Sequence, residues 1–172
     1  MGILAPQDLI RSGRALVIDF EHGELRYEPE KAALERLAGA AGALREIDYR
    51  FCEFDNHRVA AATINGVPTS LLLDTGASRT TLARNNEAIP SIASLKGKRG
   101  TATGLASIGH DLLVDGVLVG FADTSFVVST PVLPVSARCG KGILGADVLG
   151  QCTMVWGTGS LWVSCRPPTK IE

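Results

Sequence analysis

The 172-residue sequence predicts an all-β, mainly antiparallel fold, and two observations carry this prediction. Glycine is enriched at 19 residues, and the eight prolines that accompany it follow no repeating period, which is typical of a chain with many tight turns. Beyond Arg58, nearly every apolar run is short and bounded by turn residues, as β-strands are. The length suits one compact domain with room for an appendage.

The N-terminal part of the chain contains the one long helix that we predict. Residues 30–46, EKAALERLAGAAGALRE, place apolar side chains on one helical stripe. The stripe consists of Ala33, Leu34, Leu37, Ala40, Ala41 and Leu44. Two glycines weaken this helix without abolishing the pattern. We therefore interpret residues 29–56 as a helical linker.

The rest of the chain predicts strands and tight turns. Asn65-Gly66 lies between two apolar runs, and this dipeptide is the strongest short signal of a hairpin. Residues 142–150, GILGADVLG, indicate a buried strand followed by a short helix. A GTG turn connects the last two runs and predicts a second hairpin. The predicted strands are 59–64, 67–74, 110–120, 124–129, 152–156 and 160–165.

The two ends of the chain are similar in sequence. Gly2-Ile3-Leu4, Asp8-Leu9, ALVIDF, a His-Gly turn and ELRY match Gly142-Ile143-Leu144, Asp147-Val148-Leu149, CTMVW, a GTG turn and SLWV in the same order. The match is short and needs small gaps, so chance similarity stays an alternative. If the repeat is genuine, residues 1–28 are the C-terminal remnant of a preceding, similar domain. We then expect them to add strands to the sheet at the end of the chain.

Composition excludes several classes of protein. Apolar residues make up 45% of the chain and charged residues 20%, as in an ordinary globular protein. The 17 lysines and arginines nearly cancel the 18 aspartates and glutamates, so we expect no nucleic-acid partner. No apolar run approaches the roughly 20 residues of a membrane span. Asp8 and Arg11 interrupt the N-terminal segment, which lacks the apolar core of a signal peptide. Localisation stays unknown, because a targeting segment could lie upstream.

The chemical signal is the segment Leu71-Leu72-Leu73-Asp74-Thr75-Gly76-Ala77-Ser78. Three leucines that end a strand are followed at once by a carboxylate and a glycine turn. A carboxylate delivered by a buried strand is costly unless it is hydrogen-bonded or used. Asp74 is therefore the first candidate for a catalytic residue.

These features resemble the retropepsin-like aspartic proteases (clan AA), the family of retroviral proteases and their cellular and bacterial relatives. The resemblance rests on the Asn65-Gly66 hairpin, the Asp74-Thr75-Gly76-Ala77-Ser78 motif and the segment Ile143-Leu144-Gly145 with the residues that follow it. It covers about residues 57–165, and it implies a closed β-barrel-like domain with one short C-terminal helix. We assign residues 57–166 to this domain and residues 167–172 to a tail.

The resemblance also implies a role for each residue of the motif. Asp74 is the catalytic carboxylate, and Thr75 bonds across to the partner domain and locks the two catalytic loops. Gly76 lets the substrate backbone approach, because it has no Cβ. Ala77 stands where pepsin-type enzymes often carry a serine that lowers the pKa of the catalytic carboxyl. We therefore expect a milder acidic optimum than pepsin's, and a maximum below about pH 3 would contradict this. Ser78 contacts the substrate backbone, at a position that is often acidic in retroviral enzymes.

A glycine-containing hairpin covers the substrate in this family. The best candidate is Gly100–Gly109, GTATGLASIG, and its tip is expected near Gly104, Leu105 and Ala106, which would bind substrate. The alternative is an exposed glycine-rich turn without that role. No tyrosine occurs in this segment, unlike the flap of pepsin-type enzymes.

One such domain supplies one catalytic aspartate, so two domains must meet. We expect an aspartic endopeptidase that hydrolyses protein or peptide substrates, with two Asp74 residues meeting in a homodimer. One alternative is a tandem protein in which a preceding domain supplies the other carboxylate. Another is a module without catalysis that binds peptides or dimerises. The mechanism requires no metal and no cofactor.

The remaining polar candidates give weaker signals. His22, His57 and His110 have no ligand spacing, so we predict no metal site. The four cysteines are too sparse for a disulfide scaffold and are interpreted as free or buried thiols, with a Cys152–Cys165 cross-strand disulfide as an alternative. Asp147 is interpreted as a local backbone-bonding or capping residue rather than a second catalytic acid.

Overall fold

A computed structural model describes residues 9–39, 44–53, 57–93, 95, 97–103 and 108–166 of the chain. For residues 97–103 and 108–111 it describes the backbone. The strands are β1 (Arg14–Asp19), β2 (Glu24–Pro29), β3 (Arg45–Glu46), β4 (Tyr49–Phe51), β5 (Arg58–Ile64), β6 (Val67–Leu73), β7 (Thr81–Ala83), β8 (Gly97–Thr103), β9 (Ile108–Phe121), β10 (Thr124–Leu133), β11 (Gly142–Leu144), β12 (Cys152–Trp156) and β13 (Leu161–Cys165). The helices are α2 (Glu30–Ala38), α3 (Ile89–Ile92) and α4 (Ala146–Leu149).

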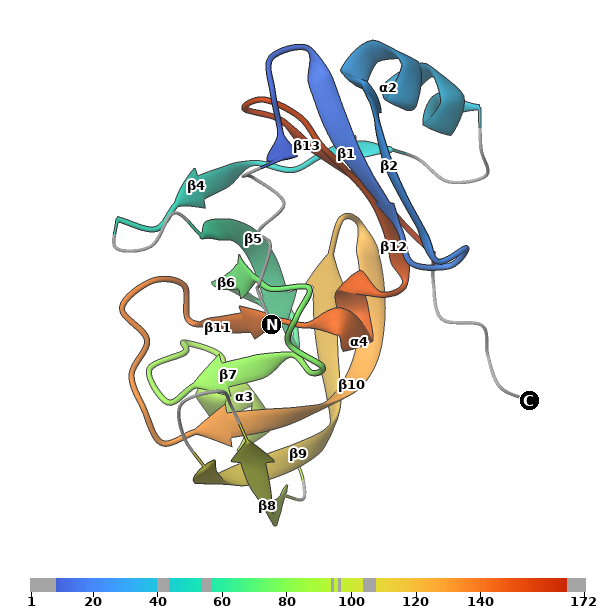
Figure 1. Cartoon of the computed structure of the whole chain (residues 1–172). Coiled ribbons are helices and arrows are strands. Elements are labelled where there is room, and N and C mark those ends of the chain that lie inside the picture. Colours follow the sequence, from blue (N-terminus) through green and yellow to red (C-terminus); the bar gives the residue numbers. More distant parts are fainter. Residues whose placement is uncertain are drawn as a thin grey trace, which may run out of the picture.

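The protein is mostly β, and its centre is a closed six-stranded barrel with few short helices around it (Figure 1). The strand order around the barrel is β5-β6-β11-β7-β10-β9, and pairing between β5 and β9 closes it. β4 adds to β5 and β8 adds to β9 outside this ring. Most pairs are antiparallel, whereas β11 runs parallel to β6 and β10 runs parallel to β7. The predicted all-β class and the closed barrel are confirmed.

The Asn65-Gly66 turn starts the barrel as the sequence predicts. Asn65 and Gly66 both have positive φ, at 48° and 80°, which is the conformation of a two-residue hairpin turn and one that suits asparagine and glycine. The Asn65 side chain accepts a hydrogen bond from the Leu118 N–H (2.9 Å), and the Asn65 N–H donates to the Leu118 carbonyl (2.8 Å). The turn is therefore fastened to β9, on the side where the barrel closes.

Alternation along the strands fills the barrel with apolar side chains. The buried residues include Ala60, Ala62, Ile64, Leu71, Leu73, Leu82, Val114, Val117, Val119, Phe126, Val128 and Leu144. These residues come from all six barrel strands, so the strands share one core.

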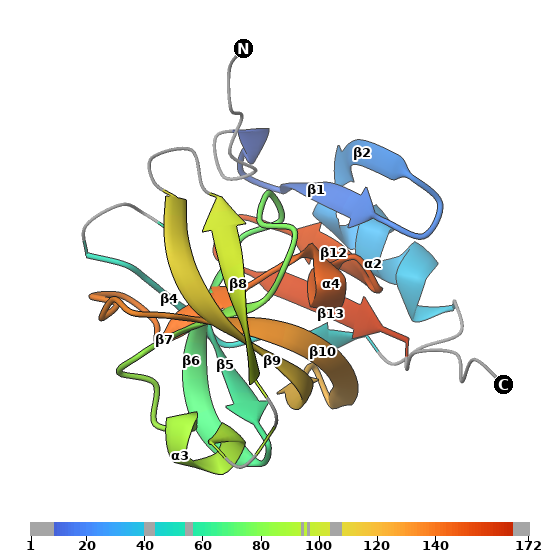
Figure 2. The ribbon, with the colours of Figure 1, turned by 90° about the horizontal axis from the view of Figure 1, so that it is seen from below.

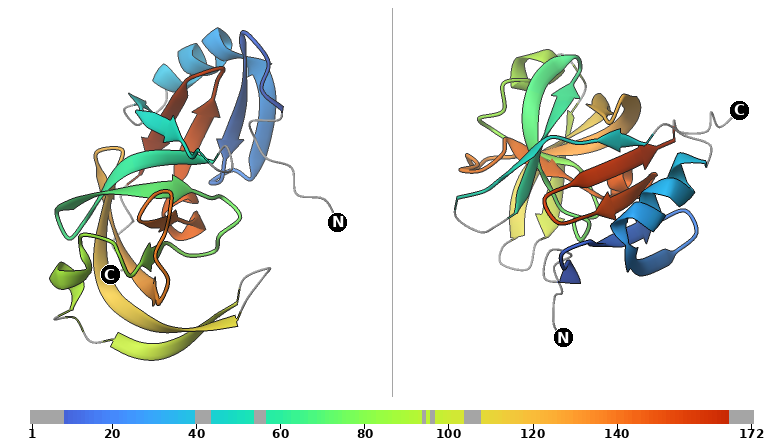
Figure 3. Two further views of the ribbon diagram at one scale, coloured as in Figure 1. Left: turned by 90° about the vertical axis from the view of Figure 1, so that its left-hand side faces the viewer. Right: turned by 90° about the horizontal axis from the view of Figure 1, so that it is seen from above.

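A second sheet lies beside the barrel, in the order β2-β1-β12-β13-β3 (Figures 1 and 3). Helix α2 covers its outer face, where Ala33 and Leu37 pack on Ala15, Val17 and Val155. Its inner face contributes to the barrel core. The N-terminal hairpin thus adds two strands to the sheet at the end of the chain, and β1 pairs with β12.

Arg58 connects this sheet to the barrel and to β4. Its side chain is buried, and its guanidinium lies over the rings of Tyr49, Phe51 and Trp156 at 4.9, 5.4 and 4.5 Å. Such cation–π contacts are strengthened where water is excluded. Strands β4 and β5 and the distant strand β12 therefore meet at one side chain.

The predicted long helix is wrong in its length. Helix α2 ends at Ala38, Gly39 follows as its cap, and residues 45–46 form strand β3 instead of helix. Glycine destabilises a helix interior, and pairing of β3 with β13 supplies alternative hydrogen bonds for the backbone. Residues 40–43 lie outside the described residues, so the region 29–56 is a helix followed by two short strands in its described part.

The prediction of free thiols is also wrong, because all four cysteines are paired. Cys152 and Cys165 are direct register partners on β12 and β13 and form a disulfide, as the alternative prediction from the sequence had it. Cys52 is bonded to Cys139, with Cα atoms 5.6 Å apart. This second disulfide joins the segment after β4 to the loop before β11.

Within the part of the chain that the structure describes, no helix has the length and apolar character needed to cross a membrane.

Candidate active site

Asp74 lies where two parallel strands end side by side. Strand β6 brings it there through Leu71 and Leu73, which are buried in the barrel. Strand β11 runs parallel to β6, with Leu144 opposite Leu73. The Asp74 N–H donates to the Leu144 carbonyl at 3.1 Å. The position of Asp74 is therefore set by the barrel and not by a free loop.

The carboxylate of Asp74 holds the turn that follows this residue. The Gly76 N–H donates to Asp74 Oδ1 at 2.9 Å, and the Ala77 N–H donates to the Asp74 carbonyl at 3.2 Å. A Cβ at position 76 would lie 3.2 Å from Oδ1, so glycine is the residue that fits this approach without a shift. Among the described residues, Asp74 Oδ2 has no hydrogen-bond partner. One oxygen thus orients the side chain, and the other is free to act.

The loop from Asp74 to Arg79 lies at the surface. Asp74, Thr75 and Ala77 are half-buried, whereas Gly76, Ser78 and Arg79 are exposed. A carboxylate in such a loop is accessible to a ligand or to another protein surface. Asp74, Thr75, Gly76, Ala77 and Ser78 are consecutive in this one loop, and the roles predicted for them stay predictions.

A second set of contacts ties the loop to helix α4. The Ala146 N–H donates to the Ala77 carbonyl at 2.7 Å. Asp147 Oδ1 accepts from the Thr80 N–H at 2.8 Å and from the Thr80 hydroxyl at 2.7 Å. The Gly145 N–H in turn donates to the Thr80 hydroxyl oxygen at 3.2 Å. The carboxylate of Asp147 is thereby hydrogen-bonded to Thr80, at the end of the loop that leads into β7.

These contacts refine the interpretation of Asp147 and add Thr80 to the site. Asp147 does bind backbone, but its partner is Thr80 in another segment, so the expectation of a local cap is wrong. Gly145 is required beside it, because a Cβ there would lie 2.4 Å from the carbonyl carbon of Arg79. No spacing rule connects residues 80 and 147. Only the pairing of β11 with β6 and β7 brings them together.

The segment predicted as a flap forms an antiparallel hairpin. Strands β8 and β9 pair from Gly97 with Val114 to Thr103 with Ile108. The predicted tip residues Gly104, Leu105 and Ala106 lie outside the described residues. In Figures 2 and 3 the ends of β8 and β9 next to this tip lie on the same side of the barrel as the loop between β6 and β7.

Among the described residues, one acidic cluster with an imidazole lies elsewhere, on the β1–β2 turn. His22 Nδ1 and Asp19 Oδ2 are 2.9 Å apart, and Glu21 joins them. Burial raises the pKa of Asp19, but hydrogen bonds and charge from His22 outweigh it and lower that pKa below its ordinary value. Glu21 also binds Arg166, so the cluster fastens the turn to the end of β13.

No protein-family model matches this chain, and no curated protein matches it at a significant level.

Proposed function

We propose that this protein is an aspartic endopeptidase of the retropepsin-like type, in which Asp74 supplies one of two catalytic carboxylates. The observation that carries the proposal is the accessible Asp74 carboxylate, delivered by a buried strand, oriented by the Gly76 N–H and backed by the β11–α4 segment.

The chemistry follows from two carboxylates at short distance. Like charges about 3 Å apart do not both ionise readily, so the pair holds one shared proton. The ionised carboxylate takes a proton from a water molecule, which attacks the scissile peptide carbonyl. The protonated carboxyl donates a hydrogen bond to that carbonyl oxygen and stabilises the negative charge that develops. The C–N bond of this tetrahedral intermediate then breaks, and the carboxyl that took the proton from water gives it to the leaving amine. The pair then titrates as a unit, with apparent pKa values that belong to both groups.

The other residues of the loop have supporting roles in this proposal. Gly76 fixes the rotamer of Asp74 through its N–H, and Thr75 reaches the opposing loop of the second domain. Ser78, exposed at the end of the loop, contacts the substrate backbone. The β8–β9 hairpin covers the substrate from the side on which the loop lies.

The second carboxylate comes from a second domain of the same kind. A homodimer would bring two copies of Asp74 together, and a tandem protein would pair Asp74 with an aspartate of another domain. Either assembly gives the same reaction.

Cleavage of a diverse peptide library tests the proposal, with the complete gene product that contains this chain as wild type and as Asp74→Asn. Asp123→Asn is the matched control, because Asp123 is exposed and binds Arg45 at the barrel surface. Wild type and Asp123→Asn are expected to cleave between about pH 4 and 7, and Asp74→Asn is expected to lose activity by at least about 1,000-fold. Equal cleavage by wild type and Asp74→Asn would remove Asp74 from the mechanism. Cleavage by none of the three would favour the binding module.

A further inference from the structure

The N-terminal and C-terminal hairpins have the same architecture. Residues 20–23 connect β1 to β2, and residues 157–160 connect β12 to β13. The open end of each hairpin is closed by the same backbone contact, from the residue after the second strand to the residue before the first. The Glu30 N–H donates to the Gly13 carbonyl at 3.1 Å, and the Arg166 N–H donates to the Gln151 carbonyl at 3.2 Å.

The two hairpins pair with each other through their first strands. β1 and β12 are antiparallel, with Leu16 opposite Trp156 and Ile18 opposite Met154. Antiparallel pairing of two like hairpins makes them related by an approximate two-fold axis between β1 and β12. The order strand, turn, strand is therefore present twice.

Register places equivalent side chains on the inner face of the sheet. Leu25 and Tyr27 of β2 lie opposite Ile18 and Leu16. Leu161 and Val163 of β13 lie opposite Trp156 and Met154. The four strands thus carry one continuous apolar face, and the barrel lies against only part of it.

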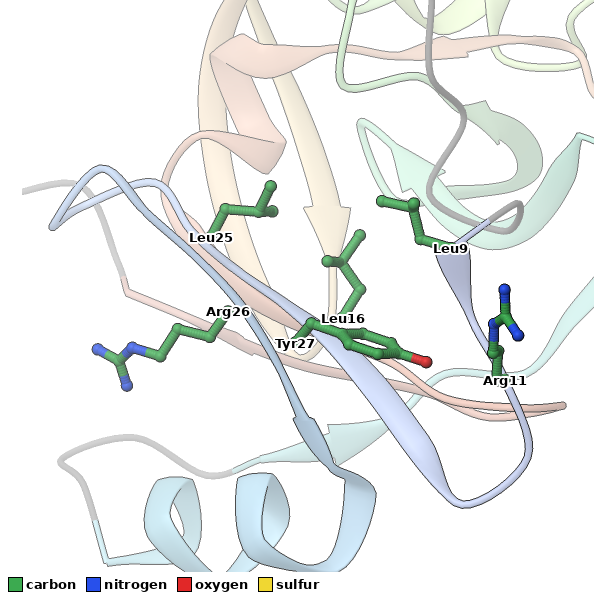
Figure 4. A pocket seen from close by; sticks show the side chains of 6 residues that line it. All are labelled: Leu9, Arg11, Leu16, Leu25, Arg26 and Tyr27. Atoms are coloured by element: carbon green, nitrogen blue, oxygen red, sulfur yellow. The ribbon is translucent and has the colours of Figure 1, made fainter.

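Exposure changes across this face from one hairpin to the other. Leu161 and Val163 are fully buried against the barrel, whereas Leu25 is 64% exposed and Tyr27 is 40% exposed. Figure 4 shows Leu9, Leu16, Leu25 and Tyr27 around an open hollow, with Arg11 and Arg26 completing its lining. Large exposed apolar residues that gather in one hollow mark a surface that binds a partner.

We propose that this hollow is the surface that binds a second barrel of the same fold, encoded immediately before this chain. In the C-terminal half, the barrel that covers the β12–β13 hairpin is the one that directly precedes it in sequence, through β11 and α4. The two-fold relation places an equivalent barrel over Leu25 and Tyr27, on the same side of the sheet. The occupant is therefore the domain to which the β1–β2 hairpin belongs.

A second copy of this chain fits less well. Each copy already has β1 on the edge of β12, so the central pairing of the sheet is made within one chain. In a homodimer, the barrel of the second copy would have to cover Leu25 and Tyr27. The β12–β13 hairpin of that copy is already paired with its own β1 and cannot also pair with β1 of the first copy. The inference rests on the proposed function only in assigning the second carboxylate to the preceding domain.

Hydroxyl-radical footprinting of side chains tests the proposal directly. The complete gene product and the 172-residue chain are labelled side by side, and the reactivities of Leu25 and Tyr27 are compared with that of Val127. Val127 is the internal control because it is 67% exposed on the barrel strand β10. Leu25 and Tyr27 are expected to react at least about fivefold more slowly in the complete product, since interface cores exclude water, and Val127 is expected to be unchanged.

Substitutions give an independent readout. Leu25→Glu in the complete product is expected to restore the fast labelling of Tyr27 and to lower cleavage, whereas Val127→Glu changes neither. Equal reactivity of Tyr27 in the two proteins would overturn the inference, as would a gene without a same-fold domain upstream. Protection of Tyr27 in the 172-residue chain at concentrations where it dimerises would also overturn it, in favour of a second copy. Protection without any cleavage would leave the inference intact and contradict the proposed function instead.

Discussion

The β1–β2 and β12–β13 hairpins share one architecture and differ in what covers them. The C-terminal hairpin has a barrel on its inner face, and its apolar residues there are buried. The N-terminal hairpin has α2 on its outer face, and its inner face is open at β2. The comparison shows that an apolar residue on such a strand stabilises the fold only to the extent that a neighbouring surface buries it.

The largest expected difference between the hairpins is in core substitutions. Leu161→Ala removes a fully buried side chain and is expected to lower the free energy of unfolding by about 3 kcal/mol. Leu25→Ala, its counterpart on β2, is expected to change that free energy by less than about 0.5 kcal/mol in the 172-residue chain. Urea unfolding of the two variants measures both values. Similar losses would mean that the open face is already covered.

The next effect concerns the disulfide that only the C-terminal hairpin has. Replacing Cys152 and Cys165 by serine opens a cross-link between residues 13 apart in sequence, and we expect a loss of about 3 kcal/mol. Urea unfolding under non-reducing conditions measures this loss. Addition of a reductant to that variant reports on Cys52–Cys139 alone. A double variant as stable as wild type would show that pairing with β1 and packing on the barrel stabilise this hairpin without the disulfide.

The smallest effect concerns the turn of the N-terminal hairpin. Because the pKa of Asp19 is lowered in the folded protein, its contribution to stability is present above its ordinary value of 3.8 and is lost as the pH falls through the lower folded value. Asp19→Asn is therefore expected to destabilise the protein near neutral pH and to lose less further stability on acidification than wild type does. Unfolding midpoints between about pH 6 and 2.5 test this, and parallel curves for the two proteins would contradict it.

Local signals predicted the parts of the fold that short segments determine. The Asn65-Gly66 turn, the strand that ends at Asp74, the GILG strand with its short helix and the last hairpin were all predicted, because each depends on the conformational preference of a few neighbouring residues. The Asp74 loop was predicted for the same reason. Its chemistry stays a prediction until cleavage is measured.

The missed features depend on contacts between distant segments. Cys52 and Cys139 are 87 residues apart, and no spacing rule connects them. Thr80 and Asp147 meet only because β11 lies between β6 and β7. The helix was predicted too long because a stripe of alanines and leucines favours a helix locally, whereas pairing of β3 with β13 takes residues 45–46 into the sheet.

We propose that Asp74 performs peptide hydrolysis as one of two carboxylates. The most direct measurement is the cleavage rate of one peptide substrate by the complete gene product and by its Asp74→Asn variant, with both proteins shown to be folded. We expect cleavage by wild type and a loss of at least about 1,000-fold in the variant. Equal rates in the two proteins would contradict it.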